Sequence, residues 1–295
     1  MGSQQHTHIE AMEARRFLDA TATLSDRGVF QVTGTDANET INIALNSDGT
    51  KVQATLGGTL LGEADVDDVK AIAVNAGKGD DTVTVDANVT KRTVVKGGAG
   101  NDTLSTDAAK VNISGGAGAD TINLNNDEGR SGADGGDGND TITGGDGDYC
   151  VNGASGEDSI TLGDGDNQVN GGGDNDTIVV GTGRNRVNGG DGDDNITAGS
   201  GDEGTAFIHG GDGDDTIVFN GETSHLFGDD GDDTITGGSG DDTIYGGDGT
   251  DSLSGGSGGT DSVNEDGPSF GDFPGGGGHH GGPGFGGEGR GRGGF

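Results

Sequence analysis

Ten aspartates between Asp81 and Asp251 recur along the chain at steps of 18 to 21 residues, and such regularly spaced carboxylates are candidate ligands for cations. Six of the nine steps are 18 residues long, and the other three are 20 or 21. A step of this length places one carboxylate in each coil of a repeating structure, so that the side chains form a single column. The column consists of Asp81, Asp102, Asp120, Asp140, Asp158, Asp176, Asp194, Asp215, Asp233 and Asp251.

A nine-residue motif, Gly-Gly-x-Gly-x-Asp-x-apolar-x, surrounds these aspartates and suits a hard cation. Seven copies without deviation begin at Gly97, Gly115, Gly135, Gly189, Gly210, Gly237 and Gly246. The glycines allow the backbone to adopt positive φ and to turn tightly with its carbonyl groups pointing inward. The aspartate adds an anionic oxygen beside those carbonyls, and Ca²⁺ prefers about six to eight oxygen ligands. The motif therefore predicts calcium sites in the turns.

Short strands must hold these turns in place. Each aspartate is followed by a β-branched or apolar segment, such as Thr141-Ile142-Thr143, which favours a strand with its middle side chain pointing inward. Two nonads make one coil of about 18 residues, and the core is then one side chain thick. Because burial of so few apolar groups offsets little of the backbone entropy, we expect the array to fold as it binds Ca²⁺.

The sixth positions of the nonads divide the coil into two different sides. From Gly135 to Thr197 seven nonads follow one another without a break. Their sixth residues are Asp140, Tyr149, Asp158, Asn167, Asp176, Asn185 and Asp194. Every second nonad thus keeps its carboxylate while the alternate nonads have lost it. We therefore predict one ladder of Ca²⁺ ions, with about nine ions in the nine gaps between ten aspartates.

The irregular nonads obey the same division. Three of them are lengthened by two or three residues, and all three fall between members of the column; they span 85–96, 124–134 and 198–209. In the remaining turns of this second side Val111 and Ser224 hold the sixth position, and only Asp242 matches the motif. We expect the second side to be mostly empty, with a weak site at most near Asp242.

The composition excludes several classes of partner. The chain has 295 residues, with 52 acidic against 15 basic residues and a formal net charge of −37. Because a charge of this sign repels polyanions, we expect no nucleic-acid partner. No apolar run is long enough to span a bilayer, so we expect no membrane insertion. The single cysteine, Cys150, excludes an internal disulfide.

The chain divides into four stretches with different composition. We expect a disordered leader at 1–28, a region of short strands at 29–96 that caps or extends the array, the repeat array at 97–263, and a disordered Gly/Phe/His-rich tail at 264–295. The strands predicted before the array are Val29–Val32, Thr40–Leu45, Lys51–Leu56, Val69–Val74, Thr82–Val85 and Thr93–Val95. The fold class that we expect is all-β.

The array resembles the RTX (repeats-in-toxin) family through its nonads at 97–263 and one degenerate copy at 76–84. The resemblance implies a right-handed parallel β-roll, a β-solenoid in which Ca²⁺ ions lie between the turns of successive coils. In the leader, Met12–Ala20 is similar to a short segment near the start of many planctomycete secreted proteins, but Phe17–Ala20 departs from its usual Leu-Leu-Ser-Ala ending. This similarity and the low calcium affinity of extracellular modules favour an extracellular or cell-surface location.

These observations favour a secreted or cell-surface calcium-binding protein with a structural or adhesive role, whose partners are Ca²⁺ and a surface or matrix component. We expect that the protein is not an enzyme. Gly255–Gly259 matches the sequence pattern of a nucleophile elbow but lies in a repeat turn. The histidines lack the spacing of a zinc site, and we expect them to be exposed. One alternative is an accessory or secretion module of an extracellular enzyme system. Another is a glycan- or ice-binding surface on the row of hydroxyl residues at the seventh positions, such as Thr141 and Thr177.

Overall fold

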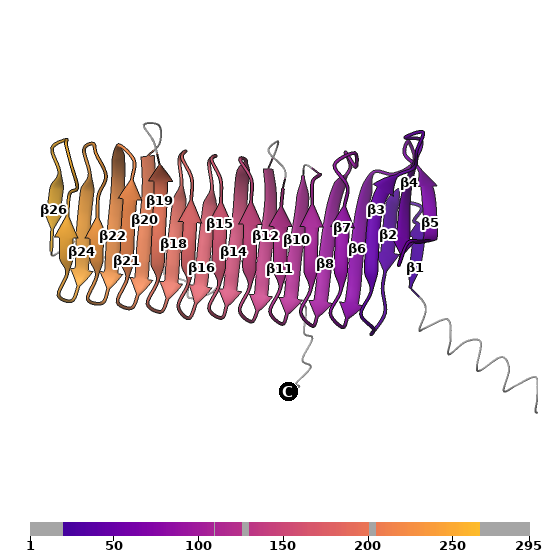
Figure 1. The fold of residues 1–295 in the computed structure, drawn as a ribbon, viewed down its shortest axis with the longest axis horizontal. Helices are drawn as coiled ribbons and strands as arrows, with labels where there is room; N and C mark the ends of the chain where they lie inside the picture. The colour runs from indigo at the N-terminus through magenta and orange to yellow at the C-terminus, as the bar shows by residue number, and fades with distance from the viewer. Residues whose placement is uncertain (1–19, 109, 126–129, 201–204, 266–295) are drawn as a thin grey trace, which may run out of the picture.

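The computed structural model describes residues 20–108, 110–125, 130–200 and 205–265, and these residues form a long solenoid (Figure 1). Two sheets of thirteen strands each, here called sheet A and sheet B, make its two faces. The chain passes from one sheet to the other and back in about ten turns, and the described residues include no helix. The expected all-β, parallel solenoid is therefore confirmed. Nothing in the described ranges forms a helix able to cross a membrane.

The strands of each sheet follow the chain order, with one strand per coil over most of the length. Sheet A contains β1 (Thr21–Leu24), β2 (Val29–Thr33), β6 (Ala71–Lys78), β8 (Arg92–Ala99), β10 (Val111–Ala117), β12 (Arg130–Asp137), β14 (Asp148–Ser155), β16 (Gln168–Gly173), β18 (Arg186–Asp191), β20 (Thr205–Asp212), β22 (Thr223–Asp230), β24 (Thr243–Asp248) and β26 (Ser262–Asn264). Sheet B contains β3 (Thr40–Leu45), β4 (Lys51–Leu56), β5 (Thr59–Asp65), β7 (Thr82–Val85), β9 (Thr103–Thr106), β11 (Thr121–Leu124), β13 (Thr141–Gly144), β15 (Ser159–Leu162), β17 (Thr177–Val180), β19 (Asn195–Ser200), β21 (Thr216–Asn220), β23 (Thr234–Thr236) and β25 (Ser252–Ser254).

The core lies between the two sheets and is built from inward apolar side chains of both, such as Ile160 of sheet B and Val169 of sheet A. Along sheet B the eighth residue of each Asp-bearing nonad points inward, and Ile142, Ile160 and Ile178 are completely buried. These isoleucines are in register from strand to strand, so each one stacks on its equivalent in the next coil. The outward residues on either side of each isoleucine are free to differ.

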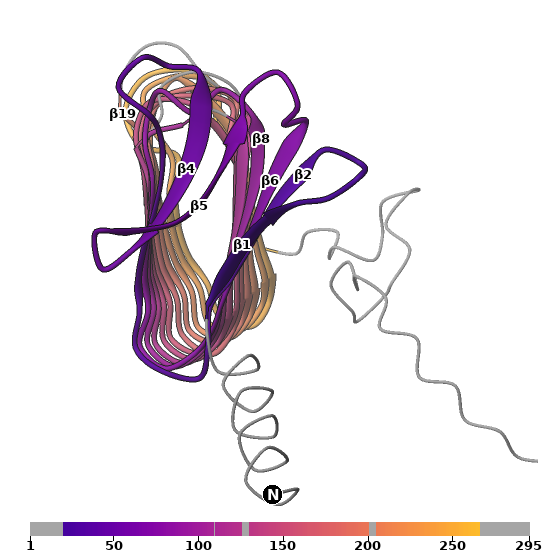
Figure 2. The ribbon, with the colours of Figure 1, turned by 90° about the vertical axis from the view of Figure 1, so that its right-hand side faces the viewer.

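The N-terminal end of the solenoid is closed by antiparallel strands. β1 pairs with β2, and β4 and β5 extend sheet B as a meander after β3. Figure 2 looks onto this end and shows β4, β5 and β1 across it. The core reaches this end, where Phe30, Ile41 and Val52 are fully buried.

Two strands at this end were not expected from the sequence. β1 lies within the stretch 1–28, for which we predicted disorder; its Ala22 packs against the core, and its backbone is held by β2. β5 follows β4 after a turn at Gly57 and Gly58, which both have positive φ. Both strands have short or weakly alternating apolar patterns, so their pairing partners rather than their own residues determine them. The helix-like run of the leader and most of the expected tail lie outside the described residues.

The two edges of the solenoid differ in regularity (Figure 1). Turns from sheet A to sheet B are short and closely similar, and they form the lower edge in the figure. Turns from sheet B to sheet A vary in length, and the three lengthened nonads all fall there, between β7 and β8, between β11 and β12, and between β19 and β20. The prediction that all three insertions lie on the side opposite the aspartate column is therefore confirmed.

Candidate metal centre

The ten aspartates of the column lie on the regular edge, one in each turn from sheet A to sheet B from the turn between β6 and β7 onward. The same hydrogen bond links each to the next: the backbone N–H of one aspartate donates to Oδ1 of the aspartate one coil later. Between Asp158 and Asp176 the N···Oδ1 distance is 2.7 Å. It stays between 2.7 and 3.0 Å along the whole column. The structure thus brings all ten predicted residues into one continuous row.

The second carboxylate oxygen, Oδ2, is different. Among the described residues it is buried without a hydrogen-bond partner in nine of the ten aspartates. These nine are Asp81, Asp102, Asp120, Asp140, Asp158, Asp176, Asp194, Asp215 and Asp233. Asp251, in the last of these turns, is only half-buried. A buried, anionic oxygen without a donor is costly, and a row of nine is a donor set that suits cations.

From Asp102 onward, each Oδ2 faces the first glycine of its own nonad, whereas the nonad of Asp81 begins with Ala76. A methyl group on Gly153 would lie 2.2 Å from Oδ2 of Asp158 and 2.4 Å from the carbonyl oxygen of Gly171 in the next coil. The same pair of oxygens recurs beside Gly97, Gly115, Gly135, Gly171, Gly189, Gly210 and Gly228. None of these first glycines has positive φ, so space beside the two oxygens, and not backbone conformation, favours glycine there. Without a Cβ, a carboxylate oxygen and a carbonyl oxygen of adjacent coils can face the same small volume.

The second and fourth glycines have the conformation that the motif predicts. Gly136 and Gly138 have φ of +116° and +118°. A methyl group on Gly136 would lie 2.0 Å from the carbonyl oxygen of Gly116 in the preceding coil. The turns therefore stack with their backbones in close contact, and substitution would force the coils apart.

Burial raises the pKa of nine of the ten carboxyl groups in the column. Desolvation is the main cause, and it raises the pKa to about 7 for Asp158 and Asp176 and to about 8 for Asp215. The backbone N–H on Oδ1 lowers each pKa, while neighbouring aspartates of the column raise it further. The pKa values of Asp102 and Asp140 are raised by the same burial. A cation beside Oδ2 would favour the ionised form and lower these pKa values again.

The opposite edge shows how a neutral side chain satisfies the same position. Nδ2 of Asn167 donates to the carbonyl oxygens of Gly163 and Gly165, at 3.3 and 3.4 Å. Nδ2 of Asn185 donates to the carbonyl four residues before it, at 2.8 Å. Oδ1 of each asparagine accepts the backbone N–H of the preceding coil, from Tyr149 and Asn167 respectively. The amide nitrogen thus occupies the place of the aspartate Oδ2 and binds the turn carbonyls itself.

Asp242, the one second-side match in the sequence, differs from the column in its hydrogen bonds. Its Oδ1 accepts the hydroxyl of Ser224 at 2.8 Å, and its Oδ2 accepts the backbone N–H of Gly238 at 2.8 Å. Both oxygens therefore have protein donors. Burial still raises the pKa of this carboxyl, and the two hydrogen bonds oppose that rise.

Glu39 extends the column by one coil at its N-terminal end. Its backbone N–H donates to Oδ1 of Asp81 at 2.8 Å, as each aspartate does to the next. Its carboxylate accepts the backbone N–H of Thr35 at 3.0 Å and also the hydroxyl of Thr35. The glutamate therefore closes the row with protein donors. The signal in the sequence was Gly34, which precedes Glu39 by the same five residues that separate first glycine and aspartate in the motif.

Asp261 is a second acidic residue that the nonad motif does not predict. Its Oδ1 accepts the backbone N–H of Asp242 at 3.2 Å, so two carboxylates stack at the C-terminal end of the opposite edge. A residue inserted after Gly258 lengthens the nonad that begins at Gly255 and breaks the fixed spacing.

The described residues contain no group of three or more His, Cys, Asp or Glu side chains that converge on one point. The column supplies one carboxylate per coil, so a cation there would take its remaining ligands from backbone carbonyl oxygens. Such mixed oxygen sites are typical of Ca²⁺. The residues present therefore fit a hard divalent cation and do not fit a zinc centre.

Two other sequence expectations concern histidine and cysteine. His209, predicted to be exposed, is in fact buried: its Nδ1 lies 2.8 Å from Oδ2 of Asp229 and its ring stacks on Phe227. The prediction was wrong because β20 and β22 place aromatic residues side by side on the outer face of sheet A, where they cover one another. Cys150 is exposed, as its outward position in the repeat predicted.

A family model for the RTX calcium-binding nonapeptide repeat matches this chain. The matched segments together cover 95–130, 133–148, 151–222 and 227–260, which is more than half of the chain. No curated protein matches it significantly. The segments coincide with the coils from β8 to β25, where the motif and the aspartate row were found.

Proposed function

The chain belongs to the RTX calcium-binding nonapeptide repeat family, and on this premise we propose that Ca²⁺ ions lie along the aspartate column, one between each pair of successive coils. One observation carries the proposal, namely the row of nine buried Oδ2 atoms without a donor. Each ion would be held by Oδ2 of the column aspartates and by carbonyl oxygens of the turns. Bound Ca²⁺ supplies the positive charge that lets these carboxyl groups stay ionised while buried.

The contrast between the two edges supports a ladder on one side. Asn167 and Asn185 donate to the turn carbonyls themselves, so a cation there would compete with an existing hydrogen bond. Asp176, between them in sequence, has no donor on Oδ2. Asp242 has donors on both oxygens, which supports a weaker affinity there than in the column.

Coupling of folding to Ca²⁺ follows from the charge. The net charge of −37 opposes compaction, and a ladder of nine divalent ions would cancel about half of it. Metal binding would then contribute directly to the folding free energy. Extracellular calcium modules bind at about 10⁻⁴ to 10⁻³ M, so the chain would stay unfolded where Ca²⁺ is scarce and would fold after export. We propose on this basis a secreted or cell-surface protein with a structural or adhesive role, folded by Ca²⁺ outside the cell.

A second candidate function rests on the outer face of sheet B. On each of eleven parallel strands two residues point outward, and all 22 are uncharged; they are almost all Thr, Ser or Asn. The first row is Thr40, Thr82, Thr103, Thr121, Thr141, Ser159, Thr177, Asn195, Thr216, Thr234 and Ser252. The second row is Asn42, Thr84, Ser105, Asn123, Thr143, Thr161, Val179, Thr197, Val218, Thr236 and Ser254.

No charged residue occurs in these two rows, although 23% of the residues of the chain are charged. The outer face of sheet A, in contrast, carries charged side chains such as those of Arg130 and Asp134. Rows of hydroxyl groups with a spacing of about 4.8 Å suit a regular polar surface, such as a glycan or ice. Substitution of Thr141 and Thr177 by lysine should abolish such binding; binding that survives both changes would exclude this role.

A Ca²⁺ titration followed by circular dichroism tests the principal proposal. The chain should be largely unfolded in chelator and should gain β signal at millimolar Ca²⁺. Asp176→Ala should shift the midpoint to much higher Ca²⁺ than Asn185→Ala, because only the first change removes a ligand. Isothermal titration should count about nine ions in the wild-type protein. Equal shifts from the two substitutions would contradict a ladder on one side.

A further inference from the structure

The two ends of the solenoid differ in whether their terminal strands are covered by other strands. At the N-terminal end β1 and β5 contact each other, and a methyl group on Gly62 would lie 2.7 Å from the carbonyl oxygen of Ala22. At the C-terminal end β25 pairs only with β23, and β26 pairs only with β24. Within the described residues the outer edges of these last two strands are unpaired. Their N–H and C=O groups are therefore available to another strand.

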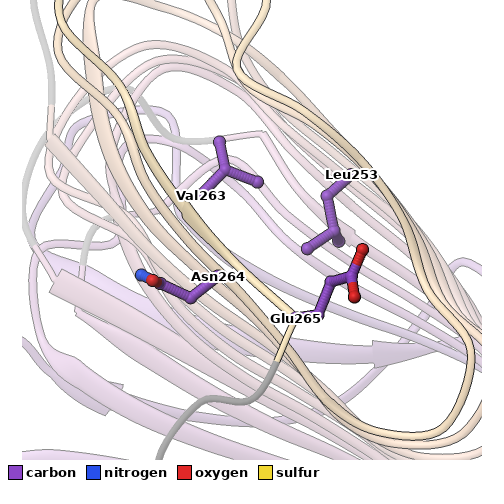
Figure 3. Close-up of a pocket in the computed structure, with 4 residues that line it drawn as sticks. All are labelled: Leu253, Val263, Asn264 and Glu265. Carbon is purple, nitrogen blue, oxygen red and sulfur yellow. The ribbon is translucent and has the colours of Figure 1, made fainter.

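Apolar side chains are exposed at the same end. Leu253 continues the core column of Ile235, and Val263 continues that of Ile244. Both isoleucines are fully buried, whereas Leu253 is half-buried and Val263 is 42% exposed. With Asn264 and Glu265 they line a hollow of about 520 Å³ that opens at the end of the solenoid (Figure 3). The apolar core is therefore exposed to solvent at the C-terminal end of the solenoid.

The sequence that follows does not carry another coil. If the pairing of β24 with β26 is continued, Pro268 falls opposite Gly249 and Asp272 falls opposite Leu253. Gly249 has φ of +144°, whereas the proline ring fixes φ near about −65°. Asp272 would put a charge at a core position. The motif therefore stops at this end, and the chain's own continuation lacks the residues to cover the open coil as a further coil.

We infer that the open C-terminal end is a self-association surface, covered by the same end of a second copy of this chain. A two-fold axis normal to the sheets would set β26 against β26 of the partner and β25 against β25, antiparallel in both cases. Such a contact would bury Leu253 and Val263 and pair both free edges. A head-to-tail contact is disfavoured because β1 and β5 close the other end. This inference does not depend on which ions occupy the aspartate column.

The strength of this contact follows from its size and charge. Strands of three residues bury far less than the about 1,200 to 2,000 Å² of a stable interface, so the dimer should be weak and should form only at high protein concentration. Glu265 at the rim and the net charge of −37 add repulsion, which salt and bound cations screen. Association should therefore strengthen as ionic strength rises.

Sedimentation equilibrium of the full chain with Ca²⁺, over a wide range of concentration, tests the inference. Wild-type protein should pass from monomer to dimer without higher species, and Val263→Lys should remain monomeric. Val179→Lys is the matched control: Val179 has a similar exposure of 38% but lies on the outer face of sheet B, and this variant should dimerise as wild type does. Circular dichroism should show equal Ca²⁺-induced folding in all three.

Removal of residues 266–295 separates self-association from coverage by the chain's own tail. If the tail does not cover the end, the shortened chain should dimerise as the full chain does. A full chain that stays monomeric at every concentration, or a Val263→Lys variant that dimerises like wild type, would overturn the inference. If dimers form only after the tail is removed, the tail itself covers the open end in the full chain. If removal of the tail abolishes the dimers, the tail forms the dimer contact. Either result also overturns the inference.

Discussion

Exchange of aspartate and asparagine between the two edges is the sharpest perturbation that the structure offers. In Asp176→Asn the new amide would have the turn carbonyls of its own nonad within reach, as Asn167 has those of Gly163 and Gly165. Its Oδ1 would keep the hydrogen bond from the backbone N–H of Asp158. The variant should therefore fold more readily than the wild type when no Ca²⁺ is present.

The magnitude follows from the shifted pKa of Asp176. Burial raises this pKa from 3.8 to about 7, so ionisation above pH 7 costs the metal-free fold about three pKa units, or at most about 4 kcal/mol. Asparagine removes that cost and adds hydrogen bonds with a net contribution of about 1 kcal/mol. The reverse change, Asn185→Asp, should lower the metal-free stability by a similar amount, because it places an unpartnered carboxylate oxygen beside the same carbonyls.

A titration with a stabilising osmolyte in the presence of chelator at pH 8 measures this stability in a chain that is otherwise unfolded. Asp176→Asn should fold at lower osmolyte concentration than wild type, and Asn185→Asp at higher. With saturating Ca²⁺, Asp176→Asn should bind one or two ions fewer, since its residue borders two gaps of the ladder. If Asp176→Asn instead lowered the metal-free stability, Oδ2 would not be the costly atom, and the reasoning would fail.

Three further predictions use other parts of the structure. Burial raises the folded-state pKa of seven column carboxyls from 3.8 to between about 6 and about 8, so the metal-free fold should be most stable below about pH 4 and lose stability as the pH rises towards 8. Circular dichroism in chelator should show β structure at acidic pH only, and a chain that stays unfolded there would contradict the burial argument. Gly153→Ala should abolish an ion site, because its methyl group would fill the space beside Oδ2 of Asp158. Gly173→Ala should leave all ion sites intact, because a methyl group there would meet no atom closer than 3.9 Å. Calorimetry would count the bound ions in both variants, and an unchanged count in Gly153→Ala would refute the placement of the ion. Hydrogen exchange at limiting Ca²⁺ should show protection first at 29–85, where Glu39 already has protein donors and where Phe30, Ile41 and Val52 are fully buried. Protection that begins in the middle of the array would exclude this region as the starting point.

The sequence predicted the repeat and its sidedness because both depend on fixed spacing. An 18-residue period requires that Asp140, Asp158 and Asp176 share one edge, whatever the details of the turn. The positive φ of the second and fourth glycines also followed from residue type. The role of the first glycine did not, because the contact that excludes a Cβ comes from the next coil and is invisible within one nonad.

Residues missed by the motif search lie where spacing or residue type changes. Glu39 continues the column with a longer side chain, and Asp261 follows a one-residue insertion. His209 is buried by Phe227 of the following coil, and only the register of β20 with β22 brings these residues together. Each miss depends on contacts between coils, whereas the motif describes a single turn.

The edge opposite the aspartate column has lost its aspartates and also carries the inserted residues, and both differences have a common physical cause. The steps from Asp81 to Asp102 and from Asp194 to Asp215 are 21 residues, yet the N···Oδ1 distance is 2.7 Å at both, as it is for 18-residue steps. Both lengthened nonads, 85–96 and 198–209, fall where the chain passes from sheet B to sheet A. A cation shared by two coils would fix the distance between its ligands, so an insertion on the aspartate edge would separate them. The asparagines satisfy their own turns, and their edge can lengthen without disturbing the column.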